Sequence, residues 1–233
     1  MADRGTRLVV FDLDGTLVDS RHDIAVAANG TLAALGLARL PEPTVVGFIG
    51  GGVRNLALRC LAAASDPERP RFEPEAFVER FMPIYAEHLL DFTRPYPGVL
   101  ETLGALRAAG LVTAVVTNKP SAPARAIIDG LGLGPFAMVV GGDSTPVRKP
   151  DPEPLLGVLR HVGATSEEAL YVGDMAIDVE TAAAARTRFV GVTWGIGARA
   201  DLEAAGATTF VERMTDLLDH VGLDDRLPRA SHP

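Results

Sequence analysis

Two carboxylates, Asp12 and Asp14, follow directly after the apolar run Leu8–Phe11. A run of β-branched and aromatic residues is typical of a buried strand in a parallel sheet. Ligands of open α/β sheets bind at the carboxyl ends of the strands, and Gly15 allows the chain to turn sharply there. Two acids one residue apart repel each other unless a cation or a reaction uses them. We therefore expect a reaction centre at this strand end.

Two later segments carry groups that suit a phosphate. An apolar run ends at Thr117, and Asn118 follows it just before a predicted helix. A hydroxyl, an amide and the backbone N–H groups of a helix start are suitable donors to phosphate oxygens. Lys149 lies in a proline-rich turn before another helix, where a fixed ammonium can neutralise a phosphate or a carboxylate.

A further strand end supplies two more acids. Asp174 follows the apolar run of residues 169–173, and Asp178 comes four positions later. Oxygen ligands from Asp12, Asp14 and Asp174, together with waters and a phosphate oxygen, would form an octahedral Mg²⁺ site. We therefore predict Mg²⁺ as the cofactor.

The second part of the chain alternates between strand and helix patterns. We expect strands at 112–117, 138–141, 169–173, 189–192 and near 209–211, and helices at 99–109, 122–131, 153–162, 178–185 and 215–221. Such alternation predicts an α/β fold, a Rossmann-like parallel sheet with helices on both faces.

Residues 21–91 differ, because they read as helical throughout. Helices are expected at 23–37, 53–64 and 73–90, and no strand pattern occurs between them. Since this block separates the first strand from the others, we predict an inserted all-helical cap domain. The expected boundaries are 1–18 and 94–224 for the core, 19–93 for the cap, and 225–233 for a loose tail.

Composition excludes several classes of partner. The chain has 233 residues, a formal net charge of −8 and no long basic run, which argues against nucleic acid and anionic membranes. Cys60 is the single cysteine, so no internal disulfide can form. We find no signal peptide and no apolar stretch of about 18 residues, and we therefore expect a cytoplasmic protein.

Together these residues resemble the four motifs of the phosphatases of the haloacid dehalogenase superfamily. The matching positions are, in chain order, Asp12-x-Asp14-Gly15-Thr16, Thr117, Lys149-Pro150 and Gly173-Asp174-x-x-x-Asp178. All of them occur in the expected order, and the resemblance covers nearly the whole chain. It implies a hydrolase core with a helical cap.

The resemblance also implies a role for each motif residue. Asp12 would be the nucleophile that forms an aspartyl-phosphate, and Asp14 the general acid and base. Thr117 and Lys149 would bind the phosphoryl group.

For the metal, the family pattern implies the carboxylate of Asp174 and the main-chain carbonyl of Asp14 as ligands, with Asp178 as a supporting carboxylate. The resemblance also suggests that the halide-removing members of the superfamily lack an acid at the position of Asp14. We therefore do not expect dehalogenase activity.

The helical insert resembles the small cap of the branch that includes phosphoglycolate phosphatases. Gly50 and Gly51 lie where such caps carry a substrate loop, and Arg54 is a candidate partner for a substrate carboxylate. The same glycines are also compatible with a simple helix break, and Arg54 with a surface charge. The resemblance favours 2-phosphoglycolate as substrate, hydrolysed to glycolate and phosphate.

Other functions fit the same residues. A sugar-phosphate mutase of the β-phosphoglucomutase type, a pyrophosphatase and a nucleotidase would all use the same aspartates. From a different class, a receiver-like switch would keep its phospho-aspartate instead of hydrolysing it. In every case the partner is a small phosphorylated metabolite or a phosphoryl donor, and the sequence leaves a monomer and a homodimer equally open.

Overall fold

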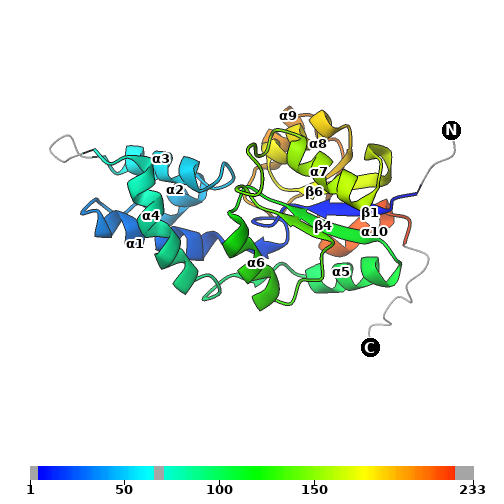
Figure 1. Cartoon of the computed structure of the whole chain (residues 1–233), viewed down its shortest axis with the longest axis horizontal. Helices are drawn as coiled ribbons and strands as arrows, with labels where there is room; N and C mark the ends of the chain where they lie inside the picture. The colour runs from blue at the N-terminus through cyan, green and yellow to red at the C-terminus, as the bar shows by residue number, and fades with distance from the viewer. Residues whose placement is uncertain (1–4, 66–70, 224–233) are drawn as a thin grey trace.

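The computed structural model describes residues 5–65 and 71–223 (Figure 1). In this part of the chain a six-stranded parallel sheet has the order β5-β4-β1-β6-β7-β8. Its strands are β1 (Leu8–Phe11), β4 (Val112–Val116), β5 (Met138–Val140), β6 (Ala169–Gly173), β7 (Arg188–Val192) and β8 (Phe210–Val211). The predicted α/β fold is confirmed.

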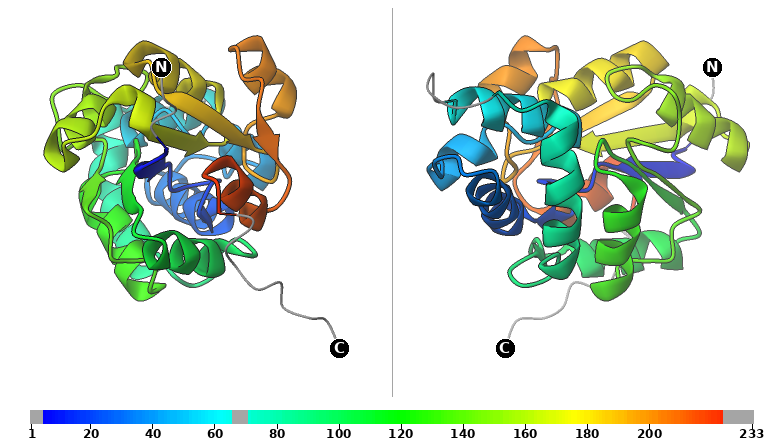
Figure 2. Two further views of the ribbon diagram at one scale, coloured as in Figure 1. Left: turned by 90° about the vertical axis from the view of Figure 1, so that its right-hand side faces the viewer. Right: turned by 60° about the vertical axis from the view of Figure 1, so that its left-hand side comes forward.

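Alternating side chains of β1 explain why helices cover both faces of this sheet. Val9 and Phe11 belong to one buried cluster, whereas Leu8 and Val10 belong to another. Because successive side chains of a strand point to opposite faces, each face needs its own apolar cover. Figure 2 shows helices on either side of the sheet.

The covering helices come from the segments between the strands. Cluster residues of α5 (Val99–Ala108), α6 (Ser121–Gly130) and α10 (Leu217–His220) pack on the face of Val9 and Phe11. Those of α7 (Glu153–Val162) and α8 (Ala176–Ala185) pack on the opposite face.

The central position of β1 determines where a ligand can bind. β1 pairs with β4 on one side and β6 on the other, so the strand order reverses direction at β1. In doubly wound sheets this reversal leaves a crevice at the carboxyl ends of the central strands. Asp12 therefore follows β1 at the edge of the sheet where ligands bind.

Four helices between β1 and β4 pack on one another, at the left in Figure 1. They are α1 (Arg21–Ala34), α2 (Glu42–Val46), α3 (Val53–Ala63) and α4 (Pro74–Glu87). On α4, Phe77, Phe81 and Tyr85 recur every four residues and stack with ring centroids 5.8 and 5.2 Å apart. This spacing places all three rings on one buried face of the helix.

Two small features were not predicted. β2 (Val18–Asp19) pairs antiparallel with β3 (Arg94–Pro95), where the sequence predicted the domain boundaries. Two residues are too few to show a strand period. The short helix α9 (Arg199–Ala204) was also missed, because it buries only Leu202.

The predicted division at 18/19 and 93/94 stays a prediction, and the predicted tail, 225–233, lies outside the described residues. None of the described helices is long and apolar enough to cross a membrane.

The two connections between sheet and helices are joined by one buried carboxylate. Asp23, at the start of α1, accepts hydrogen bonds from the backbone N–H groups of Phe92 and Thr93 at 3.1 and 2.7 Å. It also accepts one from the Thr93 hydroxyl at 2.7 Å. The outgoing and returning chains are therefore held together next to the β2–β3 pair.

Replacing Asp23 with Ala should lower the free energy of unfolding by about 3 kcal/mol, because buried donors on Thr93 lose a charged acceptor. Urea denaturation measures this change. Asp91→Ala is the matched control, since Asp91 is exposed and pairs with His88 at the surface. An equal loss in both variants would contradict the role assigned to Asp23.

Candidate active site

The predicted site residues gather at the carboxyl ends of the central strands. Asp12 follows β1, Thr117 follows β4 and Asp174 follows β6, and neighbouring strands are paired in register. Lys149 joins them from the loop between β5 and α7. All four are at most 6% exposed.

Lys149 is the cation of this cluster. Its Nζ lies 2.9 Å from Oδ1 of Asp12 and 2.7 Å from Oδ1 of Asp178. Burial by itself would lower the pKa of Lys149, but Asp12 and Asp178 more than compensate and hold the pKa well above its usual value. The ammonium therefore stays charged and positions both carboxylates.

Asp178 has the contacts of a supporting group. Besides Lys149 it accepts hydrogen bonds from the Tyr171 hydroxyl at 3.1 Å and from the backbone N–H groups of Asp174 and Met175 at 3.2 and 3.0 Å. Both of its oxygens thus have protein donors. This arrangement orients the start of α8 and the loop that carries Asp174.

Asp174 sits in a cradle of glycines. A Cβ atom on Gly15, whose φ is +87°, would lie 2.2 Å from its Oδ2, and one on Gly195 would lie 2.2 Å from its Cβ. The Asp174 carboxylate accepts hydrogen bonds from the Thr16 hydroxyl at 2.8 Å and from the N–H of Ile196 at 2.7 Å. Burial, with Asp178 and Asp12 nearby, raises the pKa of Asp174 to about 8.

A metal ion fits the acidic cluster. Carboxylate oxygens of Asp12, Asp174 and Asp178 lie within 4.8 Å of one another, and all three residues are buried. Burial also raises the pKa of Asp12 to about 6, although Lys149 opposes this rise. Three carboxylates thus face a single ammonium, and a hard divalent cation would supply the missing positive charge.

The side chain of Asp14 is not part of this cluster, but its main-chain carbonyl is available as a ligand. The local bridge to Val18 uses the carbonyl groups of Leu13 and Val18. Within the described residues no hydrogen bond reaches the carbonyl of Asp14. The expectation that Asp14 offers a metal its main-chain oxygen stays a prediction.

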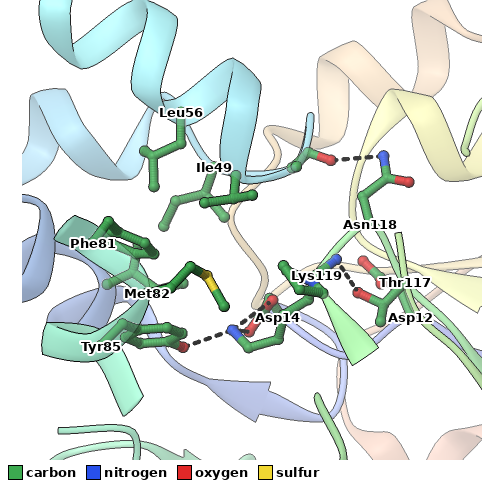
Figure 3. A pocket seen from close by; sticks show the side chains of 15 residues that line it. Asp12, Asp14, Ile49, Leu56, Phe81, Met82, Tyr85, Thr117, Asn118 and Lys119 are labelled. Carbon is green, nitrogen blue, oxygen red and sulfur yellow. Dashed lines mark hydrogen bonds and ion pairs between the residues drawn. The ribbon is translucent and has the colours of Figure 1, made fainter. Parts of the chain in front are cut away.

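The carboxylate of Asp14 has a separate set of partners. Its Oδ1 accepts hydrogen bonds from Ser20 at 2.5 Å and from the Lys119 ammonium at 2.9 Å. Lys119 also donates to the hydroxyl of Tyr85 at 2.6 Å, and Tyr85 comes from α4 (Figure 3). Burial opposes the charge of Lys119, but Asp14 and Tyr85 keep its pKa above the usual value.

Thr117 and Asn118 differ in whether their side-chain donors remain available to a ligand. Oγ1 of Thr117 accepts the backbone N–H of Lys119 at 3.2 Å, and within the described residues its own proton goes to no acceptor. Nδ2 of Asn118 instead donates to the carbonyl groups of Gly50 and Lys149 at 3.0 and 3.2 Å. Asn118 was predicted to bind phosphate, but its amide N–H groups join three backbone segments.

Only one of the three predicted substrate-binding residues of the cap lines the cavity. Gly50 lines the cavity, and a Cβ atom there would lie 2.4 Å from the sulfur of Met175. Gly51 and Arg54 do not line it. Arg54 is exposed and pairs with Glu75 at 2.8 Å, because α3 turns Leu56 inward and Arg54 toward solvent. This placement gives the expected contact of Arg54 with a substrate carboxylate no support, and that contact stays a prediction.

The cavity between these parts has two unlike walls. Asp12, Asp14, Thr117 and Lys119 form the polar wall at the sheet. The opposite wall is apolar, as Figure 3 shows for the labelled residues. Its large apolar side chains are Ile24, Ile49, Val53, Leu56, Phe81 and Met82.

Two polar residues of the cavity, Lys119 and Tyr85, received no role from the sequence. Lys119 follows a predicted strand end by two positions, and that placement was a usable signal. Tyr85 continues the four-residue spacing of Phe77 and Phe81, so only its hydroxyl distinguished it from a core residue.

Comparison with known proteins identifies the family. The model of the haloacid dehalogenase-like hydrolases matches residues 9–192. A phosphoglycolate phosphatase from Rhodospirillum rubrum is 41% identical over 222 residues, which cover 93% of this chain and 91% of that protein. A second phosphoglycolate phosphatase, from Aquifex aeolicus, is 41% identical over 190 residues, 81% of this chain and 85% of the relative.

Solved structures agree with the sequence relatives. The crystal structure of a predicted phosphoglycolate phosphatase from Haemophilus somnus superposes with a TM-score of 0.87 at 33% identity. The superposition covers 92% of this chain and 97% of the other. The chain belongs to the haloacid dehalogenase-like hydrolases.

Proposed function

We propose that this protein is a Mg²⁺-dependent phosphatase that hydrolyses 2-phosphoglycolate to glycolate and phosphate through an aspartyl-phosphate on Asp12. One observation carries the proposal: two carboxylates at one strand end have separate partners. Asp12 pairs with Lys149 beside the acidic cluster, whereas Asp14 pairs with Lys119 and Ser20. Such a division suits one nucleophile and one proton-transfer group. The names of the relatives from Rhodospirillum rubrum and Aquifex aeolicus support the substrate.

In the first step, an oxygen of Asp12 attacks phosphorus and the bond from phosphorus to the ester oxygen breaks. Asp14 gives its proton to that oxygen, and glycolate leaves. In the second step, Asp14 takes a proton from a water molecule that attacks the phosphorus of the aspartyl-phosphate. Phosphate leaves and the carboxylate of Asp12 is restored.

The other polar residues hold the phosphoryl group. Lys149 offsets the repulsion between the carboxylate of Asp12 and the anionic phosphate. The hydroxyl proton of Thr117 is available to a phosphate oxygen, because Oγ1 accepts its intramolecular hydrogen bond from Lys119.

Asp12, Asp174 and the main-chain carbonyl of Asp14 would hold Mg²⁺, with Asp178 orienting the loop of Asp174. When bound, the ion neutralises charge on the phosphoryl oxygens and on the clustered carboxylates.

We propose a small phosphorylated metabolite as the substrate, in preference to nucleic acid or a membrane surface, and a cytoplasmic location. The net charge of −8 and a cavity lined on one side by apolar residues support the first point. Cys60, a buried free thiol, supports the second.

The first prediction concerns phosphate release. With Mg²⁺ we expect the purified protein to release phosphate from 2-phosphoglycolate faster than from β-glucose 1-phosphate, pyrophosphate or nucleoside monophosphates. EDTA should abolish release, and added Mg²⁺ should restore it. An isomerised sugar phosphate as the main product would indicate a mutase instead, and stable labelling without phosphate release would indicate a receiver-like switch.

The second prediction concerns the nucleophile. Asp12→Asn should lower kcat about 10³-fold or more while the melting temperature stays within a few degrees, because the amide fills the same volume but is a poor nucleophile. Asp129→Asn, an exposed change on α6, is the control and should keep full activity. An active Asp12→Asn variant would exclude the aspartyl-phosphate at this position.

A further inference from the structure

The cavity contains a cation that phosphoryl transfer does not require. Lys119 is the only basic residue among the described residues that line the cavity. Its side chain is only 3% exposed, and burying an ammonium costs free energy unless partners or a ligand compensate. Lys149 is a separate cation, which contacts the acidic cluster at Asp12 and Asp178.

The contacts of Lys119 place its ammonium between Asp14 and Tyr85. An ammonium carries three N–H groups. Those of Lys119 reach the Asp14 carboxylate, at 2.9 and 3.1 Å from its two oxygens, and the Tyr85 hydroxyl at 2.6 Å. No further acceptor contacts its Nζ within the described residues. The three N–H groups thus have three acceptor atoms, two of them on one carboxylate, and a ligand in the cavity would share the ammonium with Asp14.

The position of Lys119 matches the length of a very short substrate. In 2-phosphoglycolate a single methylene group separates the ester oxygen from the carboxylate. Since Asp14 serves that ester oxygen, a cation that contacts Asp14 lies within reach of the substrate carboxylate. Arg54 is placed less well for this part, because it is exposed and paired with Glu75 outside the cavity.

Tyr85 connects this cation to the helical part of the protein. It comes from α4, its hydroxyl contacts Lys119, and its ring centroid lies 4.7 Å from the Lys119 Nζ. The side chains beside it on the apolar wall, Phe81 and Met82, carry no group that could bind a carboxylate. Among the described residues that line the cavity, an anionic substrate end therefore meets positive charge only at Lys119.

We propose that Lys119 is the specificity-determining residue that binds the carboxylate of the substrate, with Tyr85 positioning its ammonium. This inference rests on the proposed phosphatase function, and it is an alternative to the expected contact with Arg54. The chemistry recognised is a carboxylate placed one carbon away from a phosphate ester.

The test compares two esters that differ only in the acid. Ethyl phosphate has a methyl group where 2-phosphoglycolate has its carboxylate. Selectivity is the ratio of kcat/KM for 2-phosphoglycolate to kcat/KM for ethyl phosphate. Lys119→Met should lower this ratio about 10- to 100-fold, which corresponds to the loss of a charge-assisted contact. Tyr85→Phe should lower it less, because the ammonium remains.

Arg54→Met is the matched control, and its selectivity should stay within about twofold of wild type because a surface ion pair contributes little. Inhibition by inorganic phosphate should change little in Lys119→Met, because the phosphate subsite lies at Asp12 and Lys149. Unchanged selectivity in Lys119→Met, or lost selectivity in Arg54→Met, would overturn the inference. A parallel loss of phosphate inhibition would also overturn it by placing Lys119 in the phosphate subsite.

A binding measurement separates this inference from the proposed function. With Mg²⁺ and on the Asp12→Asn background, 2-phosphoglycolate should bind more tightly than ethyl phosphate, and the added Lys119→Met change should remove the difference. If that pattern holds while wild type releases no phosphate, the proposed function fails and the role of Lys119 stands. If wild type hydrolyses 2-phosphoglycolate but Lys119→Met binds both esters as the parent does, the role of Lys119 fails alone. Lys119→Gln replaces Lys119→Met should the latter not fold.

Discussion

The structure depends on how a few buried charges at one end of a sheet are compensated. Lys149 is the single ammonium between Asp12 and Asp178, and Asp174 lies beside them with a raised pKa of about 8. Unpaired buried charges are costly, so every element near them is arranged to supply donors or to make room. Gly15 and Gly195 allow the backbone to approach the Asp174 carboxylate, and the start of α8 is organised around Asp178.

The same constraint explains the division of labour between neighbouring acids. Asp12 and Asp14 are two residues apart, yet they contact different lysines from different loops. Lys149 belongs to the loop before α7, and Lys119 to the loop after β4. Both loops follow strands on the same side of β1, β4 and β5, and the parallel strands bring these loops to the edge of the sheet where β1 ends.

Much of this site could be predicted from the sequence because it is local to strand ends. Asp12, Thr117 and Asp174 each follow an apolar run, and parallel strands bring such positions together. Arg54 could not be placed in this way, because the direction of a helical side chain depends on which face packs inward. The β2–β3 pair could not be predicted for a different reason. Each strand has only two residues, which is too short to show a periodicity, and the pairing joins segments far apart in the sequence. The contact of Lys119 with Tyr85 likewise requires the packing of α4 against the core.

The buried carboxylate of Asp23 has a mechanical consequence. Two independent tethers would allow the helices to twist against the sheet as well as to tilt. Here the Asp23 carboxylate accepts hydrogen bonds from Phe92 and Thr93 in the returning segment. The adjacent β2–β3 pair joins the same outgoing and returning segments. The two connections are therefore bonded to each other beside the sheet. Since Tyr85 lies on the last helix before the returning chain, this bonded pair fixes where the helices that carry Tyr85 join the core that carries Lys119.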